Sequence, residues 1–311
     1  MSASPGGKLL SGDAHPTLAQ DLAGELNVAL EPVTITTFAD GEASICIEGD
    51  MRDALVFIVQ PTSPPVAEHL LTLALLIDAA RAAGAVRTVA LVPYFGYARQ
   101  EQRSQRGEPR SAQVAARLLA AVGLDHLVTL DLHAPALESA FPMPVTQLRA
   151  EELFVPRLRE WKLHDLTIVA PDAGGLKRGQ RYASALDAGL AVIAKTRSRP
   201  DVAAQRQVLG DVQGRTCVLV DDLASTGRTL AGSAEALRRA GAREVHAVFT
   251  HAVMAAEARE RLLSAPLDRI MTSDSIPIAE HTRLEVVRIA PLLAQAVRGL
   301  SGGDSPFQAK R

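Results

Sequence analysis

A pair of acids followed by a short loop of small and hydroxyl side chains has the clearest chemistry in this chain. The apolar residues 216–220 end at Asp221 and Asp222, and a helical pattern begins a few residues later. The loop between them contains Ser225, Thr226, Gly227, Arg228 and Thr229. Hydroxyls and backbone N–H groups of such a loop can converge on one phosphate, and the positive end of the following helix adds to the attraction. We predict a phosphate site, with the two acids holding ribose hydroxyls or a metal ion; an ordinary strand-to-helix corner is the alternative.

A basic stretch after the apolar residues 191–194 is the second candidate. Lys195 and Arg197 are separated by one residue, and Arg199 and Pro200 follow. A run of this kind taken alone is usually a solvated loop. Two cations on a closing loop can, however, stabilise charge on a migrating phosphoryl or pyrophosphoryl group and exclude water. The position of the run, after one predicted strand and before the next, favours the catalytic interpretation.

Four further groups of residues could take part in binding. They are Phe38, Asp40, Gly41 and Glu42; Arg99 and Gln100 after residues 87–92; His133 after residues 127–130; and Asp172 after residues 166–170. Each group also has a structural alternative. Phe38 and its neighbours could form a β-turn with a core phenylalanine, and Arg99 could be a solvated arginine that opens a helix. His133 could be a structural histidine, and Asp172 could cap a helix. If a site here bound Mg²⁺, which prefers oxygen ligands, the Asp172 carboxylate would suit it better than the His133 imidazole, which would act through water or a phosphate.

The elements that must position these residues form a repeated pattern. Residues 80–92 and 237–249 both read as a helix end, a glycine corner and a buried strand, and an apolar strand precedes each helix. This predicts two copies of one α/β unit, with parallel sheets between helices. Ligands of such sheets bind beyond the carboxyl ends of the strands, where the candidate residues lie. Chance similarity of two Ala-Gly-Ala segments is the alternative.

Composition limits the class of protein. The 311 residues are 47% hydrophobic and 22% charged, enough for two domains of roughly 100–200 residues. A net charge of −2 gives no electrostatic case for nucleic-acid binding. The N-terminus lacks the apolar core of a signal peptide, and no run of about 18 apolar residues occurs, so we expect a cytoplasmic protein without membrane contact. Cys46 and Cys217 belong to separate β-like runs and are expected to be buried, reduced thiols.

Together these segments resemble the phosphoribosyl pyrophosphate synthetases, or ribose-phosphate pyrophosphokinases, over about residues 38–277. The similar segments are residues 38–42, Pro-Tyr-Phe-Gly-Tyr-Ala-Arg-Gln at 93–100, Asp-Leu-His-Ala at 131–134, Pro-Asp-Ala-Gly-Gly at 171–175, and the loops at 195–200 and 221–229. The resemblance implies an α/β fold of two tandem type I phosphoribosyltransferase domains, each a mainly parallel sheet flanked by helices. We expect an N-terminal domain at 1–148, a C-terminal domain at 149–290, and a helix and tail at 291–311 that could pack back on the first.

The same resemblance implies a reaction and a set of site residues. The β,γ-pyrophosphoryl group of Mg-ATP would pass to the anomeric hydroxyl of ribose 5-phosphate, giving phosphoribosyl pyrophosphate and AMP. Lys195 and Arg197 would be the catalytic cations, and His133 and Asp172 would position Mg²⁺ and the triphosphate. The nucleotide would bind residues 38–42 together with Arg99 and Gln100, with Phe38 reaching the site of a neighbouring subunit in a homo-oligomer built from dimers. Residues 225–229 would hold the 5-phosphate, and Asp221 and Asp222 the sugar hydroxyls.

Two departures from the common bacterial pattern leave other functions open. Ser225 stands where that pattern has Asp, and Arg228 replaces a glycine. A non-catalytic regulatory subunit of a synthetase is therefore the main alternative. A nucleobase phosphoribosyltransferase would share the phosphate loop, and a ligand-sensing transcription regulator would carry a basic helix-turn-helix segment, which we do not find. Residues 99–103 and 107–111 also depart from the family pattern, so regulation by phosphate or ADP is not predicted.

Overall fold

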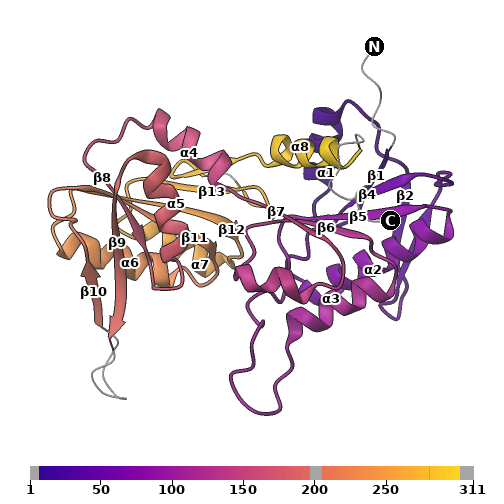
Figure 1. Ribbon diagram of the computed structural model, residues 1–311, viewed down its shortest axis with the longest axis horizontal. Coiled ribbons are helices and arrows are strands. Elements are labelled where there is room, and N and C mark those ends of the chain that lie inside the picture. The colour runs from indigo at the N-terminus through magenta and orange to yellow at the C-terminus, as the bar shows by residue number, and fades with distance from the viewer. Residues whose placement is uncertain (1–6, 197–204, 280, 302–311) are drawn as a thin grey trace. The chain divides into compact units, whose positions relative to one another are not determined.

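The computed structural model describes residues 7–196, 205–279 and 281–301. The chain divides into two compact units (Figure 1). The first comprises Met1–Leu148, Ser275–Pro277 and Arg288–Arg311, and the second comprises Arg149–Asp274 and Ile278–Val287. No helix within the described residues is long and apolar enough to cross a membrane.

The first unit is a parallel sheet covered by helices on both faces. In chain order its elements are β1 (Gly7–Ser11), α1 (Pro16–Leu26), β2 (Val33–Thr37), β3 (Ala43–Ile47), β4 (Leu55–Val59), α2 (Val66–Ala82), β5 (Arg87–Val92), α3 (Ser111–Ala121), β6 (His126–Leu130), the 3-10 helix η1 (Pro135–Ala140), β7 (Val145–Leu148) and α8 (Ala290–Ser301). The parallel strands follow the order β1-β4-β5-β6-β7. Helices α1 and α8 cover one face and α2 and α3 the other (Figure 1).

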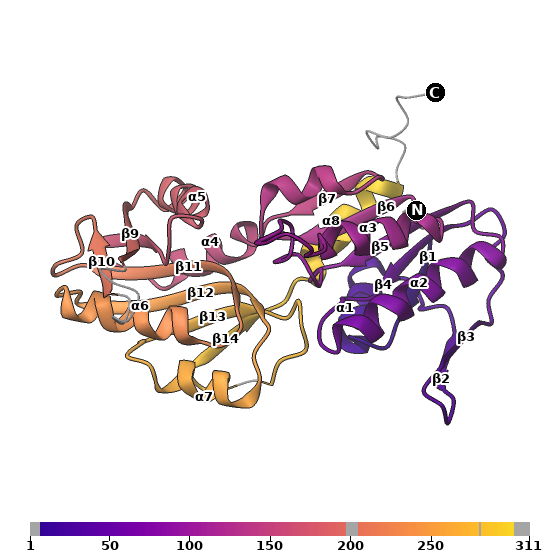
Figure 2. The ribbon, with the colours of Figure 1, turned by 90° about the horizontal axis from the view of Figure 1, so that it is seen from below.

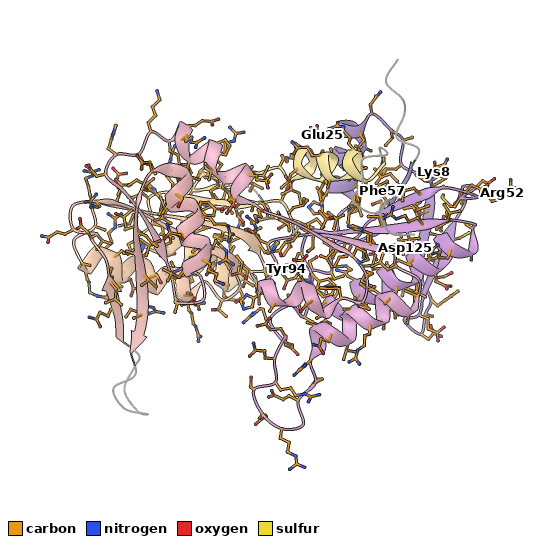
Figure 3. All side chains as sticks on the ribbon, viewed as in Figure 1. Lys8, Glu25, Arg52, Phe57, Tyr94 and Asp125 are labelled. Carbon is orange, nitrogen blue, oxygen red and sulfur yellow. The ribbon has the colours of Figure 1, made fainter. Side chains whose placement is uncertain are left out.

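Burial explains why these strands are nearly continuous apolar runs. A parallel strand with helices on both faces has no solvated side, and β4 accordingly reads Leu-Val-Phe-Ile-Val. Phe57 in its centre is buried, whereas Lys8 on the edge strand β1 pairs with Glu31 at 2.5 Å (Figure 3). The C-terminal helix α8 packs on α1, where the Arg298 guanidinium donates to the carbonyl of Glu25. The last described helix is therefore part of the first unit.

The second unit has the same layers and a longer sheet. Its elements are α4 (Glu151–Glu160), β8 (Leu166–Ala170), α5 (Leu176–Leu186), β9 (Gly189–Thr196), β10 (Gln205–Leu209), β11 (Thr216–Ala224), α6 (Arg228–Arg239), β12 (Glu244–Ala252), α7 (Ala256–Ser264), β13 (Ile270–Ser273) and β14 (Leu284–Val287). The strand order is β10-β9-β8-β11-β12-β13-β14, in which β10 pairs antiparallel with β9 and the other neighbours are parallel. Helices α4 and α5 lie over one face, and α6 and α7 over the other (Figure 2).

The two units repeat one topology. Strands β1-β4-β5-β6-β7 correspond in order and direction to β8-β11-β12-β13-β14. The hairpin β2–β3 follows α1 as the hairpin β9–β10 follows α5. In the first unit this hairpin is a separate antiparallel pair that extends away from the sheet, whereas in the second it continues the sheet (Figure 2). The predicted α/β class with two tandem domains is confirmed.

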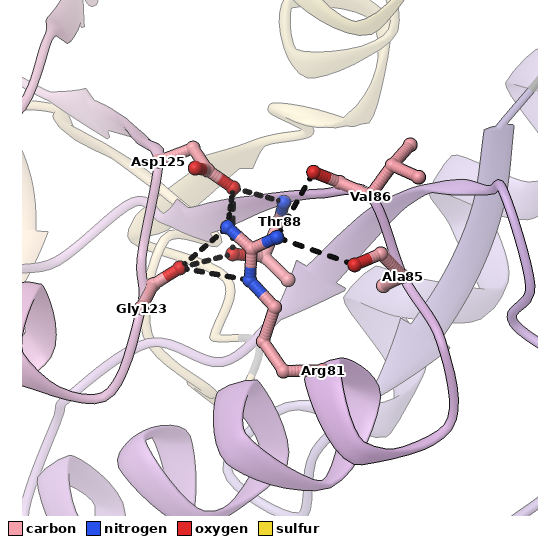
Figure 4. Close-up of polar contacts among 6 residues, drawn as sticks. All are labelled: Arg81, Ala85, Val86, Thr88, Gly123 and Asp125. Atoms are coloured by element: carbon pink, nitrogen blue, oxygen red, sulfur yellow. Dashed lines mark hydrogen bonds and ion pairs between the residues drawn. The ribbon is translucent and has the colours of Figure 1, made fainter.

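An arginine closes the helix–glycine–strand corner in each unit. In the first unit Arg81 donates to the carbonyls of Ala85, Val86 and Gly123 and pairs with Asp125, whose Oδ2 also accepts from the Thr88 N–H (Figure 4). Gly84 has φ +100° at this corner, and the corresponding Gly241 has φ +86°. A left-handed backbone conformation costs little for glycine and much for other residues. The repeated Ala-Gly-Ala sequence is thus a repeated structure.

Two local expectations from the sequence were wrong. The strand that begins at Thr216 does not end at Val220 but continues to Ala224, because β12 is long enough to pair with it through Ala252. Cys217 is buried as expected, and burial raises its pKa to about 11, but Cys46 is exposed on the hairpin strand β3. A two-stranded hairpin that extends from the sheet has a face without a covering layer, so its apolar run does not bury the thiol.

Candidate functional site

The acid pair lies within β11 and is held by one arginine. Asp221 and Asp222 have side chains that are 17% and 6% exposed. Arg178, from the first turn of α5, places Nη1 3.3 Å from Oδ1 of Asp221 and Nη2 3.3 Å from Oδ1 of Asp222. One guanidinium therefore bridges both carboxylates, which its fork of donors suits better than an ammonium would.

Burial and the neighbouring acid make Asp221 harder to ionise than an ordinary aspartate. Burial, and then the neighbouring charge of Asp222, raise the pKa of Asp221 to about 8, while Arg178 opposes the rise. A carboxylate in low dielectric is stabilised by hydrogen-bond donors or cations. The Asp221 carboxylate is therefore suited, when ionised, to accept hydrogen bonds from hydroxyl groups of a sugar or to bind a cation.

The loop after the acids leads to a helix whose N-cap residue provides no side-chain acceptor, although the Arg228 N–H donates to Thr226 Oγ1 at 3.4 Å. Helix α6 begins at Arg228, and its N-cap Gly227 has φ +69° and gives no side-chain cap. No acidic residue lies in the first turn of α6. The first N–H groups of a helix lack intrahelical acceptors, and the helix dipole makes this end positive. The Ser225–Thr229 segment therefore has the features of the predicted phosphate cradle, with Arg228 and Thr229 as the first residues of the helix.

Asp172 follows β8 and uses one of its two oxygens locally. Its Oδ1 accepts from the N–H of Gly175 at 3.1 Å, so the predicted capping role is present. The side chain is half-buried, and its Oδ2 has no hydrogen bond within the part of the chain that the structure describes. An available carboxylate oxygen suits a hard cation such as Mg²⁺. The structural and the metal-binding interpretations of Asp172 are compatible.

The described residues contain no group of three or more His, Cys, Asp or Glu side chains that could hold a metal ion by themselves. Mg²⁺ commonly keeps several waters and binds through one or two carboxylates and the phosphates of a substrate. The residues present fit that mode of binding rather than a cage made of protein ligands alone.

One of the two predicted catalytic cations lies in the hairpin β9–β10. Lys195 lies in β9, where its Cα pairs with that of Arg206 in β10. Arg197 lies outside the described residues. Strand β9 therefore continues past the apolar residues 191–194 to Thr196, because it pairs antiparallel with β10 as far as Gln205.

The first unit contributes the hairpin turn of residues 38–42. The Phe38 N–H donates to the carbonyl of Glu42 at 2.8 Å, Gly41 has φ +92°, and Asp40 Oδ1 accepts from the Glu42 N–H. The turn was one of the structural alternatives, but the phenylalanine is not a core residue, since Phe38 is 58% exposed. An aromatic ring at the tip of a hairpin is available for stacking on a planar ligand.

Arg99 and Gln100 follow β5 in an irregular segment and not in a helix. Both are exposed, and Gln100 Oε1 accepts from the hydroxyl of Ser111, the first residue of α3. Upstream, the Gly96 N–H donates to Thr62 Oγ1 at 2.6 Å and fixes the segment. The backbone at Gly96 lies so close to Thr62 and Val66 that a side chain would not fit at this position. Arg99 therefore does not open a helix, as the structural alternative supposed. It lies in the irregular segment that precedes α3.

His133 follows β6 beyond a strained residue. Asp131 has φ +41°, its N–H donates to the carbonyl of Leu148, and His133 is exposed two residues later. A positive φ at a residue other than glycine is costly and is typical of functional loops. The exposed imidazole fits a role toward a soluble ligand better than the structural alternative, in which it would be packed.

A buried glutamine of the first unit stands at the position that corresponds to Asp221 in the second. Gln60 follows β4 as Asp221 follows the first five residues of β11, and it is fully buried. Its side chain accepts from the Ala14 N–H at 3.1 Å and donates to Asp13 Oδ1 at 2.9 Å. A Cβ at Gly12 would overlap the Gln60 amide. Gln60 therefore binds the polar atoms of the loop after β1, at the position in the first unit that corresponds to Asp221 in the second.

Arg178 is the residue of this site that the sequence did not single out. It lies in the Pro171–Arg178 segment that attracted attention through Asp172 and its glycines. An arginine in the first turn of a helix is expected to be solvated unless it is known that this helix lies beside the acid pair. The only available signal was the excess of buried negative charge at two adjacent aspartates, which calls for a cation.

Comparisons with known proteins agree with this geometry. Residues 7–123 match the model of the N-terminal domain of ribose phosphate pyrophosphokinase, and residues 145–278 match the phosphoribosyl transferase domain. The chain is 40% identical to a ribose-phosphate pyrophosphokinase of Xanthomonas axonopodis pv. citri, over 96% of this chain and 95% of the relative. It is 38% identical to that of Vibrio cholerae, over 97% and 98% of the two chains.

A solved structure shows the same fold. The phosphoribosylpyrophosphate synthetase of Mycobacterium smegmatis superposes with a TM-score of 0.87 at 35% identity, over 94% of this chain and 98% of that one. Identity at this level over almost the whole length of both chains shows common descent. The chain belongs to the ribose-phosphate pyrophosphokinase family.

Proposed function

We propose that this protein is a ribose-phosphate pyrophosphokinase that forms phosphoribosyl pyrophosphate and AMP from ATP and ribose 5-phosphate. The observation that carries the proposal is the arrangement in the second unit, where a buried acid pair is followed, on one strand–loop–helix segment, by a helix whose N-cap residue provides no side-chain acceptor. Acids for ribose hydroxyls and N–H groups for a phosphate are the two features that a ribose 5-phosphate site requires. Relatives with this name match the whole chain.

In the proposed reaction the anomeric hydroxyl oxygen attacks the β-phosphorus of ATP. The bond from that oxygen to the β-phosphorus forms, the bond from the β-phosphorus to the oxygen it shares with the α-phosphorus breaks, and AMP leaves with that oxygen. The hydroxyl proton is released to solvent or to the departing phosphate. No covalent enzyme intermediate is required, because the substrate supplies the nucleophile.

Residues of the chain would position the reactants. Asp221 and Asp222 accept hydrogen bonds from ribose hydroxyls, and residues 225–229 bind the 5-phosphate through backbone N–H groups and hydroxyls. Lys195 and Arg197 stabilise the negative charge of the migrating pyrophosphoryl group. Residues 38–42 together with Arg99 and Gln100 bind the nucleotide. The 58% exposure of Phe38 supports a ring that stacks on adenine at a neighbouring subunit's site, and hence a homo-oligomer built from dimers.

Magnesium would be held by the available carboxylate oxygen of Asp172 and by the phosphates of ATP, with His133 acting through water or a phosphate oxygen. When bound, the ion neutralises charge on the triphosphate and makes the β-phosphorus a better electrophile. Asp172 is suited to this because its second oxygen is already fixed by the Gly175 N–H, so the carboxylate does not need to be ordered on binding.

Product analysis tests the proposal directly. Purified protein with ATP, Mg²⁺ and ribose 5-phosphate should yield AMP and phosphoribosyl pyrophosphate in equal amounts, and Lys195→Ala should reduce the rate by about 100-fold or more, as expected for loss of a charge that acts in the transition state. The control is Lys177→Ala, which removes an exposed lysine of α5 and should leave the rate unchanged. AMP formation in the absence of a nucleobase separates the proposal from a phosphoribosyltransferase. A folded protein that binds ribose 5-phosphate but forms no product would instead be a regulatory subunit.

A further inference from the structure

The guanidinium of Arg206 lies directly on the backbone of helix α6. Arg206 belongs to β10, and Gly232 belongs to the second turn of α6. A Cβ built at Gly232 would lie 2.8 Å from Nη2 and would overlap Nη1 and Cζ of Arg206. Nη2 of Arg206 also donates to the carbonyl of Arg228 at 3.3 Å. The contact therefore requires glycine at position 232.

Both partners of this contact are locally unfavourable choices. Glycine in the interior of a helix is less stable than alanine, because it loses more backbone freedom on folding. The Nε atom of Arg206 is buried without a hydrogen-bond partner within the described residues, which is also costly. Gly232 itself is buried, so a larger apolar residue there could have filled space in the core. A local cost at both positions points to a role for the contact beyond packing.

The place of the contact suggests what that role is. Arg206 is the register partner of Lys195 in the β9–β10 hairpin. Arg228, whose carbonyl it binds, is the first residue of α6 and part of the phosphate loop. The contact therefore joins the strand pair that carries a proposed catalytic cation to the helix that would hold the 5-phosphate of the substrate.

We propose that Arg206, seated on Gly232, is a positioning residue that fixes the base of the catalytic hairpin against the phosphate loop. It holds the hairpin so that Lys195 meets the migrating pyrophosphoryl group in register with the bound sugar phosphate. This inference rests on the proposed function, because it assigns the hairpin to the chemical step. It adds two residues, Arg206 and Gly232, that take no part in binding either substrate.

The inference is tested with two single variants and their combination. Gly232→Ala displaces the guanidinium, and Arg206→Met removes it while leaving room for a methyl group. Each should lower kcat by about 10-fold or more, since small displacements of reacting groups have effects of this size. KM for ribose 5-phosphate, and its affinity measured by calorimetry, should change by less than about 2-fold, because the phosphate loop itself is intact. Gln207→Ala, an exposed neighbour on β10, is the matched control and should match the parent.

The double variant distinguishes positioning from general damage. Once methionine replaces Arg206, alanine at position 232 has nothing to displace, so the double variant should have the kcat of Arg206→Met and no lower value. Unchanged kcat in Gly232→Ala, additive losses in the double variant, or a loss of ribose 5-phosphate binding equal to the loss of kcat would each overturn the inference. The parent protein is assayed first: if it forms no phosphoribosyl pyrophosphate, the proposed function has failed, whereas an active parent with unaffected variants means that the positioning role alone is wrong.

Discussion

Arg81 and Arg238 occupy the same place in the two units and make the same set of contacts. Arg81 pairs with Asp125, whose Oδ2 accepts from the Thr88 N–H, and Arg238 pairs with Asp268 at 2.6 Å, whose Oδ2 accepts from the Val245 N–H. Each guanidinium also binds carbonyls of its own glycine corner and of the segment that leads to the next strand. One side chain thus ties a helix end to two neighbouring parallel strands.

Removal of this clamp should destabilise the unit that contains it. Arg238→Met removes the guanidinium donor from Asp268 and from the carbonyls of Arg243 and Pro266, while Asp268 keeps the Val245 N–H, and we expect the free energy of unfolding to fall by about 1–3 kcal/mol. Trp161 is the single tryptophan and lies in the second unit, so its fluorescence in urea reports the unfolding of that unit. Arg239→Met, next to it on α6 and paired only with Glu235 at an exposed site, should change the value by less than about 0.5 kcal/mol. Equal effects of the two variants would contradict this account.

Arg178 should determine how well the acid pair binds a sugar. Arg178→Gln removes the guanidinium that bridges Asp221 and Asp222 and that opposes the rise in the pKa of Asp221, so the pair would hold its proton to still higher pH and accept fewer hydrogen bonds. We expect KM for ribose 5-phosphate to rise by about 10-fold or more, with a smaller change in KM for ATP. Lys177→Gln, the adjacent exposed residue, is the control. A change confined to the ATP constant would place Arg178 in the nucleotide site instead.

Binding of ribose 5-phosphate should strengthen with pH in a window set by the acid pair. The pKa of Asp221 is raised to about 8, so the folded protein holds a proton on the pair that is lost as pH rises through that value. Hydrogen bonds from ribose hydroxyls favour the ionised carboxylate, and KM for ribose 5-phosphate should therefore fall between about pH 7 and 9. Asp221→Asn cannot ionise, and its KM should be high and flat over the same range. A parent profile that parallels the variant would show that the pair does not titrate here.

Gly227 should be needed for the phosphate loop. It has φ +69°, and a Cβ would lie 2.8 Å from the carbonyl of Ala258. Gly227→Ala is expected to lower stability by about 1–3 kcal/mol and to weaken ribose 5-phosphate binding, because the loop would move to relieve the strain. Gly24→Ala in α1 makes a useful comparison, since a Cβ there meets no atom within 4 Å and alanine favours a helix. That variant should be as stable as the parent or more so, with the same affinity.

His126 should make the first unit sensitive to acid. Burial lowers its pKa to about 4, and Nε2 lies 2.8 Å from Thr146 Oγ1. The unfolded chain takes up a proton near pH 6.5 and the folded chain only near pH 4, so stability should fall as pH drops through this window and level off below it. The difference of about 2.5 pKa units corresponds to about 3 kcal/mol. His126→Gln should lose less stability than the parent between pH 7 and 4, whereas exposed His164→Gln should behave as the parent does.

The parts of the fold that the sequence predicted best are those with local causes. The repeated helix end, glycine corner and strand at residues 80–92 and 237–249 could be recognised because φ above zero at Gly84 and Gly241 and buried apolar runs are properties of single segments. The end of β11 was predicted four residues too early, since acids rarely continue a buried strand. Only the length of the neighbouring β12 extends it to Ala224.

The residues of the candidate site also fall into those that the local sequence could predict and those that it could not. Residue type and order marked Asp221, Asp222, the phosphate loop and Asp172, because their chemistry is local to one strand end. Arg178 and Arg206 could not be found in this way, since a charged residue in a helix or on an edge strand is usually solvated. Their partners lie 43 and 26 positions away, at Asp221 and Gly232.

The sequence by itself determined the class of fold, the family and the segments that carry the chemistry, because strand, glycine and acid patterns act over a few residues each. The tertiary structure decided what the residues at the corresponding ends of the two strands contact. In the first unit the Gln60 side chain binds Ala14 and Asp13 in the loop after β1, and in the second Arg178 crosses from α5 to bridge the acids. Both outcomes depend on side chains meeting across strands and helices, and such distances are set only when the whole sheet is packed.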